Sequence, residues 1–215
     1  MQIESDGILI NMYPFSERDM IARVFTKDNG VLVGMLRGAG VAKKNKALIG
    51  QYGSVAWNAR LDSQLGVFHW EPEKNLAAQL MLNPDLLKIM NSVFALICVL
   101  IPERESYENL YRRTLNLLAD LPNAELPYEN YLQWELGLLA DLGYALDLNK
   151  CSGCGVQDNL CYVSPKTGRA VCKNCGQPYA DKLYKMPLSL DVLKRFVENV
   201  CRVQGVEIPF QRKML

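Results

Sequence analysis

Two closely spaced cysteine pairs constrain the fold of this chain more than any other feature of its sequence. Cys151 and Cys154 form one Cys-x-x-Cys pair, Cys172 and Cys175 form the second, and 17 residues separate them. This spacing is typical of a zinc ribbon, in which four thiolates surround one ion at roughly 2.3 Å. Four protein ligands leave no position for water or substrate. We therefore predict one structural zinc ion per chain, which organises a module at residues 149–181.

Other chemistry remains open at these cysteines. Paired thiols also hold iron–sulfur clusters or form a redox-active dithiol. Cys161 lies between the pairs and is close enough to compete as a ligand, but it breaks the paired spacing and falls in a strand-like run. We interpret it as a small packed side chain. Cys98 and Cys201 lie in apolar helical stretches and are predicted to be core residues.

The composition indicates a soluble globular chain. Of 215 residues, 49% are apolar and 22% are charged, which disfavours both disorder and a fibrous repeat. The longest apolar stretch, residues 86–101, contains Lys88 and is shorter than the roughly 20 residues that cross a bilayer. The first residues lack a basic leader followed by an apolar block. We therefore expect a cytoplasmic protein with no membrane partner.

The first 72 residues read as strands. Five apolar runs, each five to seven residues long, predict a small barrel or sandwich. They cover residues 8–12, 20–26, 31–37, 54–59 and 65–70. Asn29-Gly30 lies between the second and third runs, where this pair favours a type I′ hairpin turn.

From residue 73 the apolar spacing changes to that of helices. Four helices are predicted from capping residues or a first-turn proline. Their starts are Asn83-Pro84, Ser106, Pro127 and Ser189, and the first three end at Ile101, Leu121 and Gly143. The last should bury a stripe within residues 192–200. Together with the strands, these helices predict an α+β chain.

One basic stretch points to nucleic acid. No acidic residue occurs between Asp28 and Asp62, whereas five cations do. They are Arg37, Lys43, Lys44, Lys46 and Arg60. Beside strands that carry Trp57, Phe68 and Trp70, such cations suit a groove for single-stranded nucleic acid, because cations meet phosphates and aromatic rings stack on bases. The alternative is a solvated loop whose lysines only aid solubility.

Three segments at the N-terminus carry a family resemblance. The residues GILINMYPFSERD (7–19), VFTKDNG (24–30) and LRGAG (36–40) resemble the opening of the bacterial RecO family. The similarity continues through residues 131–143 and the cysteine pairs, so it covers most of the chain. No single motif carries it; their order does.

The resemblance implies a fold and a set of sites. It implies a five-stranded OB-fold barrel at residues 1–72, followed by an α-helical domain at 73–215 with an inserted four-cysteine zinc ribbon. Arg37, Lys43, Lys44 and Lys46 match the family's basic loop after the third strand. Cys151, Cys154, Cys172 and Cys175 match its zinc ligands.

The resemblance also implies a function without covalent chemistry. Members of the family mediate DNA repair and recombination: they bind single- and double-stranded DNA, anneal complementary strands, and work with RecR to load RecA. They also dock the acidic C-terminal tail of single-strand-binding protein on the helical domain. Residues 73–149 are acidic overall, so this docking would need a local basic spot from Arg104, Arg112 or Arg113. The chain is then expected to be cytoplasmic and associated with the nucleoid.

Other functions remain open from the residues. An RNA-binding or ribosome-associated protein also combines an OB-fold with a zinc ribbon. His69-Trp70-Glu71 with later cysteines is similar to zinc deaminases, in which Glu shuttles protons, so a zinc-dependent hydrolase or deaminase is a further alternative. A scaffold that binds only protein is the last.

Overall fold

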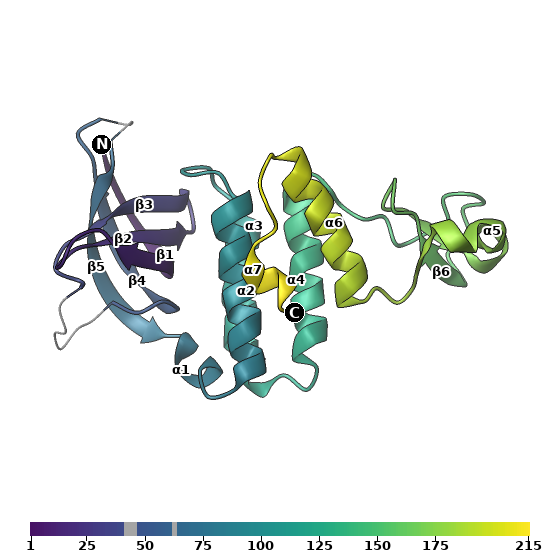
Figure 1. The fold of residues 1–215 in the computed structure, drawn as a ribbon, viewed down its shortest axis with the longest axis horizontal. Helices are drawn as coiled ribbons and strands as arrows, with labels where there is room; N and C mark the ends of the chain where they lie inside the picture. The colour runs from purple at the N-terminus through teal and green to yellow at the C-terminus, as the bar shows by residue number, and fades with distance from the viewer. Residues whose placement is uncertain (41–46, 62–63) are drawn as a thin grey trace. The chain divides into compact units, whose positions relative to one another are not determined.

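The computed structural model describes residues 1–40, 47–61 and 64–215. The chain divides into two compact units. The barrel unit comprises Met1–Pro127 and Pro209–Leu215, and the cysteine unit comprises Tyr128–Ile208. Figure 1 draws the elements of both along the chain. A domain boundary after residue 72 stays a prediction.

Five strands of the barrel unit close into a barrel. They are β1 (Gln2–Pro14), β2 (Met20–Thr26), β3 (Gly30–Leu36), β4 (Gln51–Asn58) and β5 (Gly66–Asn75). Their order, β1-β2-β3-β5-β4, closes when β1 pairs with β4. All neighbours are antiparallel except β3 and β5. This arrangement confirms the five-stranded OB-fold barrel, and with the helices below it confirms the α+β class.

Strand β1 is longer than predicted because it serves two partners. Its first half, Gln2 to Ile8, pairs with β4, and its second half, Gly7 to Pro14, pairs with β2. A register shift between Leu9 and Asn11 interrupts the pairing with β2. Such a bulge bends a strand sharply, which a small closed barrel needs.

The predicted type I′ turn at Asn29-Gly30 is wrong. Thr26 pairs with Gly30, so three residues join β2 to β3. Gly30 has a positive φ of 59°, but Asn29 does not, and a type I′ turn requires both. The Thr26 hydroxyl instead donates to the Gly30 carbonyl at 2.8 Å and fixes the loop.

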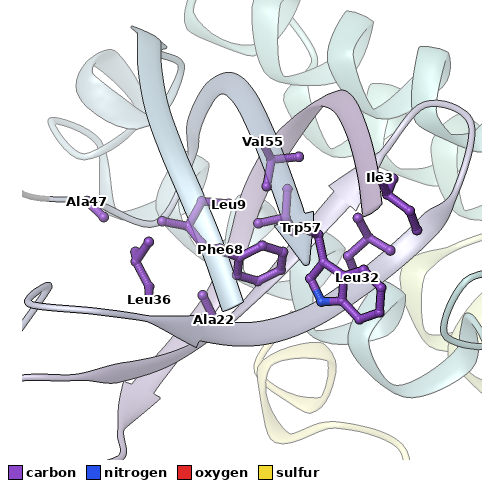
Figure 2. Close-up of a cluster of buried hydrophobic side chains, with 10 residues drawn as sticks. Ile3, Leu9, Ala22, Leu32, Leu36, Ala47, Val55, Trp57 and Phe68 are labelled. Carbon is purple, nitrogen blue, oxygen red and sulfur yellow. The ribbon is translucent and has the colours of Figure 1, made fainter. Parts of the chain in front are cut away.

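The barrel interior is filled by alternate residues of all five strands (Figure 2). Trp57 and Phe68 face each other across β4 and β5 and are only 3% and 5% exposed. The Trp57 indole donates to the carbonyl of Val33 at 2.9 Å. These two aromatic residues therefore belong to the core, and their predicted role in stacking on bases is wrong.

Helices cover part of the barrel's outer surface within the same unit. They are α1 (Ala77–Leu80), α2 (Pro84–Leu100), α3 (Glu108–Asp120), the 3-10 turn η1 (Leu121–Asn123) and α7 (Phe210–Lys213). Phe25 of β2 is fully buried and meets the ring of Tyr111 edge-on at 5.4 Å. Arg23 of β2 donates to the carbonyl of Cys98 at 3.0 Å. The outward side chains of β2 are thus occupied by the chain's own helices.

The cysteine unit holds two longer helices and a small sheet. Its elements are α4 (Pro127–Asp141), β6 (Leu160–Val163), β7 (Ala170–Cys172), α5 (Lys173–Gly176), η2 (Gln177–Lys182), β8 (Tyr184–Lys185) and α6 (Leu190–Val203). The three strands run in the order β7-β6-β8. Pro127 begins α4 as predicted, and Gly143 follows its end with a φ of 86°. Among the described residues, no helix combines the length and apolar character needed to span a membrane.

The predicted helix caps have mixed outcomes. Asn83 and Ser189 cap α2 and α6, where their side chains accept from the amides of Asp85 and Val192. The prediction for Ser106 is wrong, because α3 begins at Glu108 and has no side-chain cap. Propensity alone does not decide which polar residue reaches the first turn.

This difference can be measured. We expect Ser189→Ala to lower the free energy of unfolding by about 1 kcal/mol, because it leaves the Val192 amide without its acceptor. Ser106→Ala, the matched control, should change it by less than about 0.5 kcal/mol. Urea denaturation of both variants gives the comparison. Equal effects would contradict the observed start of α3.

Candidate metal centre and nucleic-acid interface

The four predicted metal ligands come together. The sulfur atoms of Cys151, Cys154, Cys172 and Cys175 all lie within 4.8 Å of one another. The first two lie in a turn before β6, Cys172 ends β7, and Cys175 lies in α5. Strand β6 and most of β7 lie within the intervening 17 residues, and the pairing of these strands brings the second cysteine pair next to the first.

The spacing of the sulfurs fits a tetrahedral ion. Bonds of roughly 2.3 Å place two ligand sulfurs about 3.8 Å apart. The sulfurs of Cys154 and Cys172 are 3.7 Å apart. The Gly153 amide donates to the Cys151 sulfur at 3.4 Å, and Gly155 turns the chain with a φ of 79°. The cluster is thus positioned to hold a metal ion.

The pKa values of the clustered thiols also indicate a site that suits a cation. Backbone hydrogen bonds, foremost from Cys172, lower the pKa of Cys151 to about 6. Sharing hydrogen bonds with its neighbours, foremost Cys154, raises the pKa of Cys175 to about 12. Four sulfurs this close do not all ionise without a positive charge between them. A bound dication supplies that charge and displaces the protons.

The other cysteines lie outside this cluster. Cys161 is half-buried in β6 and is not among the clustered sulfurs. Cys201 is buried in α6, as predicted. Cys98 is half-buried in α2, and burial raises the pKa of its thiol to about 11. These three thiols are packed side chains.

The predicted DNA-binding cations occupy different parts of the barrel. Arg37 is exposed directly after β3, next to the strand pair that ends at Met20. Arg60 is exposed on the loop after β4, where the Ala59 amide donates to the carbonyl of Met1 at 3.0 Å. Arg37 and Arg60 therefore lie near opposite ends of β1. Lys43, Lys44 and Lys46 fall outside the described residues.

Sequence reasoning missed two exposed aromatic residues. Tyr13 is the second-last residue of β1 and Phe15 follows the strand, with 47% and 60% of their surfaces exposed. Trp70, the third predicted stacking residue, is half-buried. The signal was present in the sequence, because Phe15 follows a proline and precedes a polar turn, where no core strand continues.

An open groove of about 460 Å³ on the barrel has the opposite charge. Four exposed carboxylates line it, from Glu4, Asp6, Asp28 and Glu71. His69 lies in the same groove and bonds to Glu71 at 3.0 Å. The clustered group contains four cysteines and no histidine. The one-histidine, two-cysteine set of a deaminase therefore does not form among the described residues.

Fold and site together define a class: an OB-fold barrel joined to helices and a four-cysteine module that is suited to a metal ion. Two family models match the chain, Recombination protein O N terminal over residues 1–72 and Recombination protein O C terminal over residues 81–210.

Individual relatives agree with these models. The DNA repair protein RecO of Ruegeria sp. (strain TM1040) is 38% identical over 188 residues, which is 87% of this chain and 78% of the relative. That of Jannaschia sp. (strain CCS1) is 36% identical over 93% of this chain and 82% of the relative. The DNA repair protein RecO of Rickettsia bellii (strain OSU 85-389) is 37% identical over 87% of this chain and 77% of the relative. The chain belongs to the RecO family of DNA repair proteins.

Metal content tests the site directly. We expect the purified protein to hold one ion per chain and Cys172→Ser to lose it, because three sulfurs and a weaker hydroxyl ligand do not complete the tetrahedron. Cys161→Ser is the matched control and should keep the ion. Elemental analysis of both gives the result. Equal metal content in the two variants would contradict the four-sulfur assignment.

Proposed function

We propose that this chain is a mediator of DNA repair and recombination that binds single- and double-stranded DNA and anneals complementary strands without covalent chemistry. The observation that carries the proposal is the closed barrel with the strand order of an OB-fold. Exposed Arg37 begins a stretch of its sequence that holds cations and no acidic residues. Membership of a DNA repair family adds to it. Arg37, Lys43, Lys44 and Lys46 would contact phosphates, and Arg60 would make a separate contact.

The barrel's surface limits where DNA would bind. The outward side of β2 contacts helices through Phe25 and Arg23, so bases have no open platform there. The groove lined by Glu4, Asp6 and Glu71 repels phosphates. Exposed Arg37 gives its end of the barrel a favourable charge, and we place the DNA there.

Annealing follows from charge neutralisation. Two complementary strands repel through their phosphates, and cations that replace counterions lower that repulsion. A mediator that holds strands by phosphates leaves their base edges free to pair. The net charge of +1 is small for this role, so strong binding would draw on partners.

The metal in this proposal is zinc with a structural role. Four thiolates in a tetrahedron suit zinc, and the ion, when bound, fixes the turns that carry the two cysteine pairs. Loss of zinc would unfold the module first and affect DNA binding only as a consequence. Iron–sulfur clusters use the same ligands, and elemental analysis separates the two.

Protein partners follow from the family resemblance. We propose RecR as the direct partner, loading of RecA as the result, and action at the nucleoid in the cytoplasm. The acidic tail of single-strand-binding protein would need cations on the helices. Arg104 is exposed in the loop before α3, and Arg112 is exposed in the second turn of α3, which supports docking near that helix.

Salt dependence tests the proposed contacts. We expect Lys43→Glu, Lys44→Glu and Lys46→Glu together to flatten the fall of single-strand affinity with salt by about 0.7 per lost contact in the log–log slope, roughly 2 in all. The same variant should anneal complementary strands more slowly. Fluorescence anisotropy at several salt concentrations measures the slope.

The control reverses the same number of charges elsewhere. Lys173, Lys182 and Lys185 are all exposed in the cysteine unit, and their triple change to Glu should leave the slope near that of the wild type. Unchanged affinity and slope in the first variant would refute the proposed loop. Tighter binding to RNA than to DNA of the same sequence would favour an RNA-binding function instead.

A further inference from the structure

The loop between β1 and β2 is held in one shape by its own hydrogen bonds. The amides of Phe15 and Ser16 both donate to the Asp19 carbonyl, at 3.0 and 3.1 Å. The Ser16 hydroxyl accepts from the amides of Arg18 and Asp19, at 3.3 and 3.1 Å. Four hydrogen bonds within five residues fix the direction in which the loop presents its side chains.

The same loop is bonded to the segment that follows β3. The Gly40 amide donates to the Arg18 carbonyl at 2.9 Å, and the Gly38 amide donates to the Asp19 carboxylate at 2.9 Å. A Cβ at Gly40 would lie 3.2 Å from the Arg18 carbonyl, so the two segments pack closely. This contact brings the loop with Phe15 and Arg18 to the segment that begins at Arg37.

Phe15 is exposed although it is large and apolar. Its exposed fraction is 60%, whereas Trp57 and Phe68 of the barrel are almost fully buried. A ring in this position adds little to the core. It lies instead on a rigid loop beside two exposed arginines, which is the combination that single-stranded nucleic acid uses, a face for stacking and cations for phosphates.

We propose that Phe15 stacks on a base of single-stranded nucleic acid while Arg18 and Arg37 contact the neighbouring phosphates. This inference rests on the proposed function and names the aromatic residue that the buried Trp57 and Phe68 do not supply. Tyr13, exposed two residues earlier near the end of β1, offers a second ring. The site takes unpaired bases, because in a duplex the base faces are stacked on each other.

Charge favours nucleic acid over an apolar protein partner at this loop. Arg18 and Arg37 are exposed, and neither takes part in an ion pair within the described ranges. Asp19 is engaged by the Gly38 amide, which leaves Glu17 as the exposed acid of the loop. Exposed cations in the loop of Phe15 and in the segment bonded to that loop match a phosphate backbone that carries its bases.

Loss of the ring tests the inference. We expect Phe15→Ala to weaken binding of a single-stranded oligonucleotide about tenfold, since one stacked base contributes about that factor. Phe15→Ala and the wild type should bind an abasic strand of the same length and charge with equal affinity. Phe15→Trp should retain affinity. The matched control is Phe210→Ala, which removes a similarly exposed ring on α7 and should have no effect.

The outcomes separate this inference from the proposed function. Single-strand binding that is unchanged in Phe15→Ala, while the wild type keeps its salt dependence, overturns the stacking role alone. An equal loss for the abasic strand also overturns it, because the ring would then act without a base. A wild type that binds no DNA overturns both the inference and the proposed function.

Discussion

Closure of the barrel and burial of the Trp57 indole depend on each other. The ring donates to the Val33 carbonyl at 2.9 Å and lies against Gly66, where a Cβ would come within 2.1 Å of the indole nitrogen. Gly66 pairs with Gly34 at one end of the parallel pairing that joins β3 to β5. A side chain at position 66 would therefore displace the indole, open this contact and leave the barrel unclosed. Gly34 and Gly66 therefore leave room for the Trp57 indole inside the closed barrel.

The closed barrel decides which surfaces remain for a ligand. Closure leaves no free sheet edge, and the helices α2 and α3 take the outer side of β2 through Arg23 and Phe25. A groove lined by carboxylates excludes phosphates from another part of the surface. The end where the β1–β2 loop meets the segment after β3 carries exposed Arg18 and Arg37 and is favourable for phosphates. The four-cysteine module lies in the other unit, and its geometry explains local folding rather than recognition of DNA.

The sequence predicts features that depend on neighbouring residues and misses those that depend on distant ones. The clustering of the two cysteine pairs, the strand runs and the caps at Asn83 and Ser189 follow from local spacing, and they are confirmed. Alternation along β4 places Trp57 on one face of the strand but does not say whether that face is the core. Ser106 and Asn29 have the right residue type, yet tertiary packing starts the helix later and sets a three-residue turn. Arg60 is near the other cations only along the chain, because it follows a residue bonded to Met1, whereas Arg37 lies near the other end of β1.

Hydrogen exchange of the full chain with and without a single-stranded oligonucleotide tests the central claim, that DNA binds at the loop end of the barrel. Amide protection should rise at residues 13–19 and 37–40 and should stay unchanged at residues 4–6 and 69–71, which border the acidic groove. Protection of the acidic groove, or of no part of the barrel, would contradict this account.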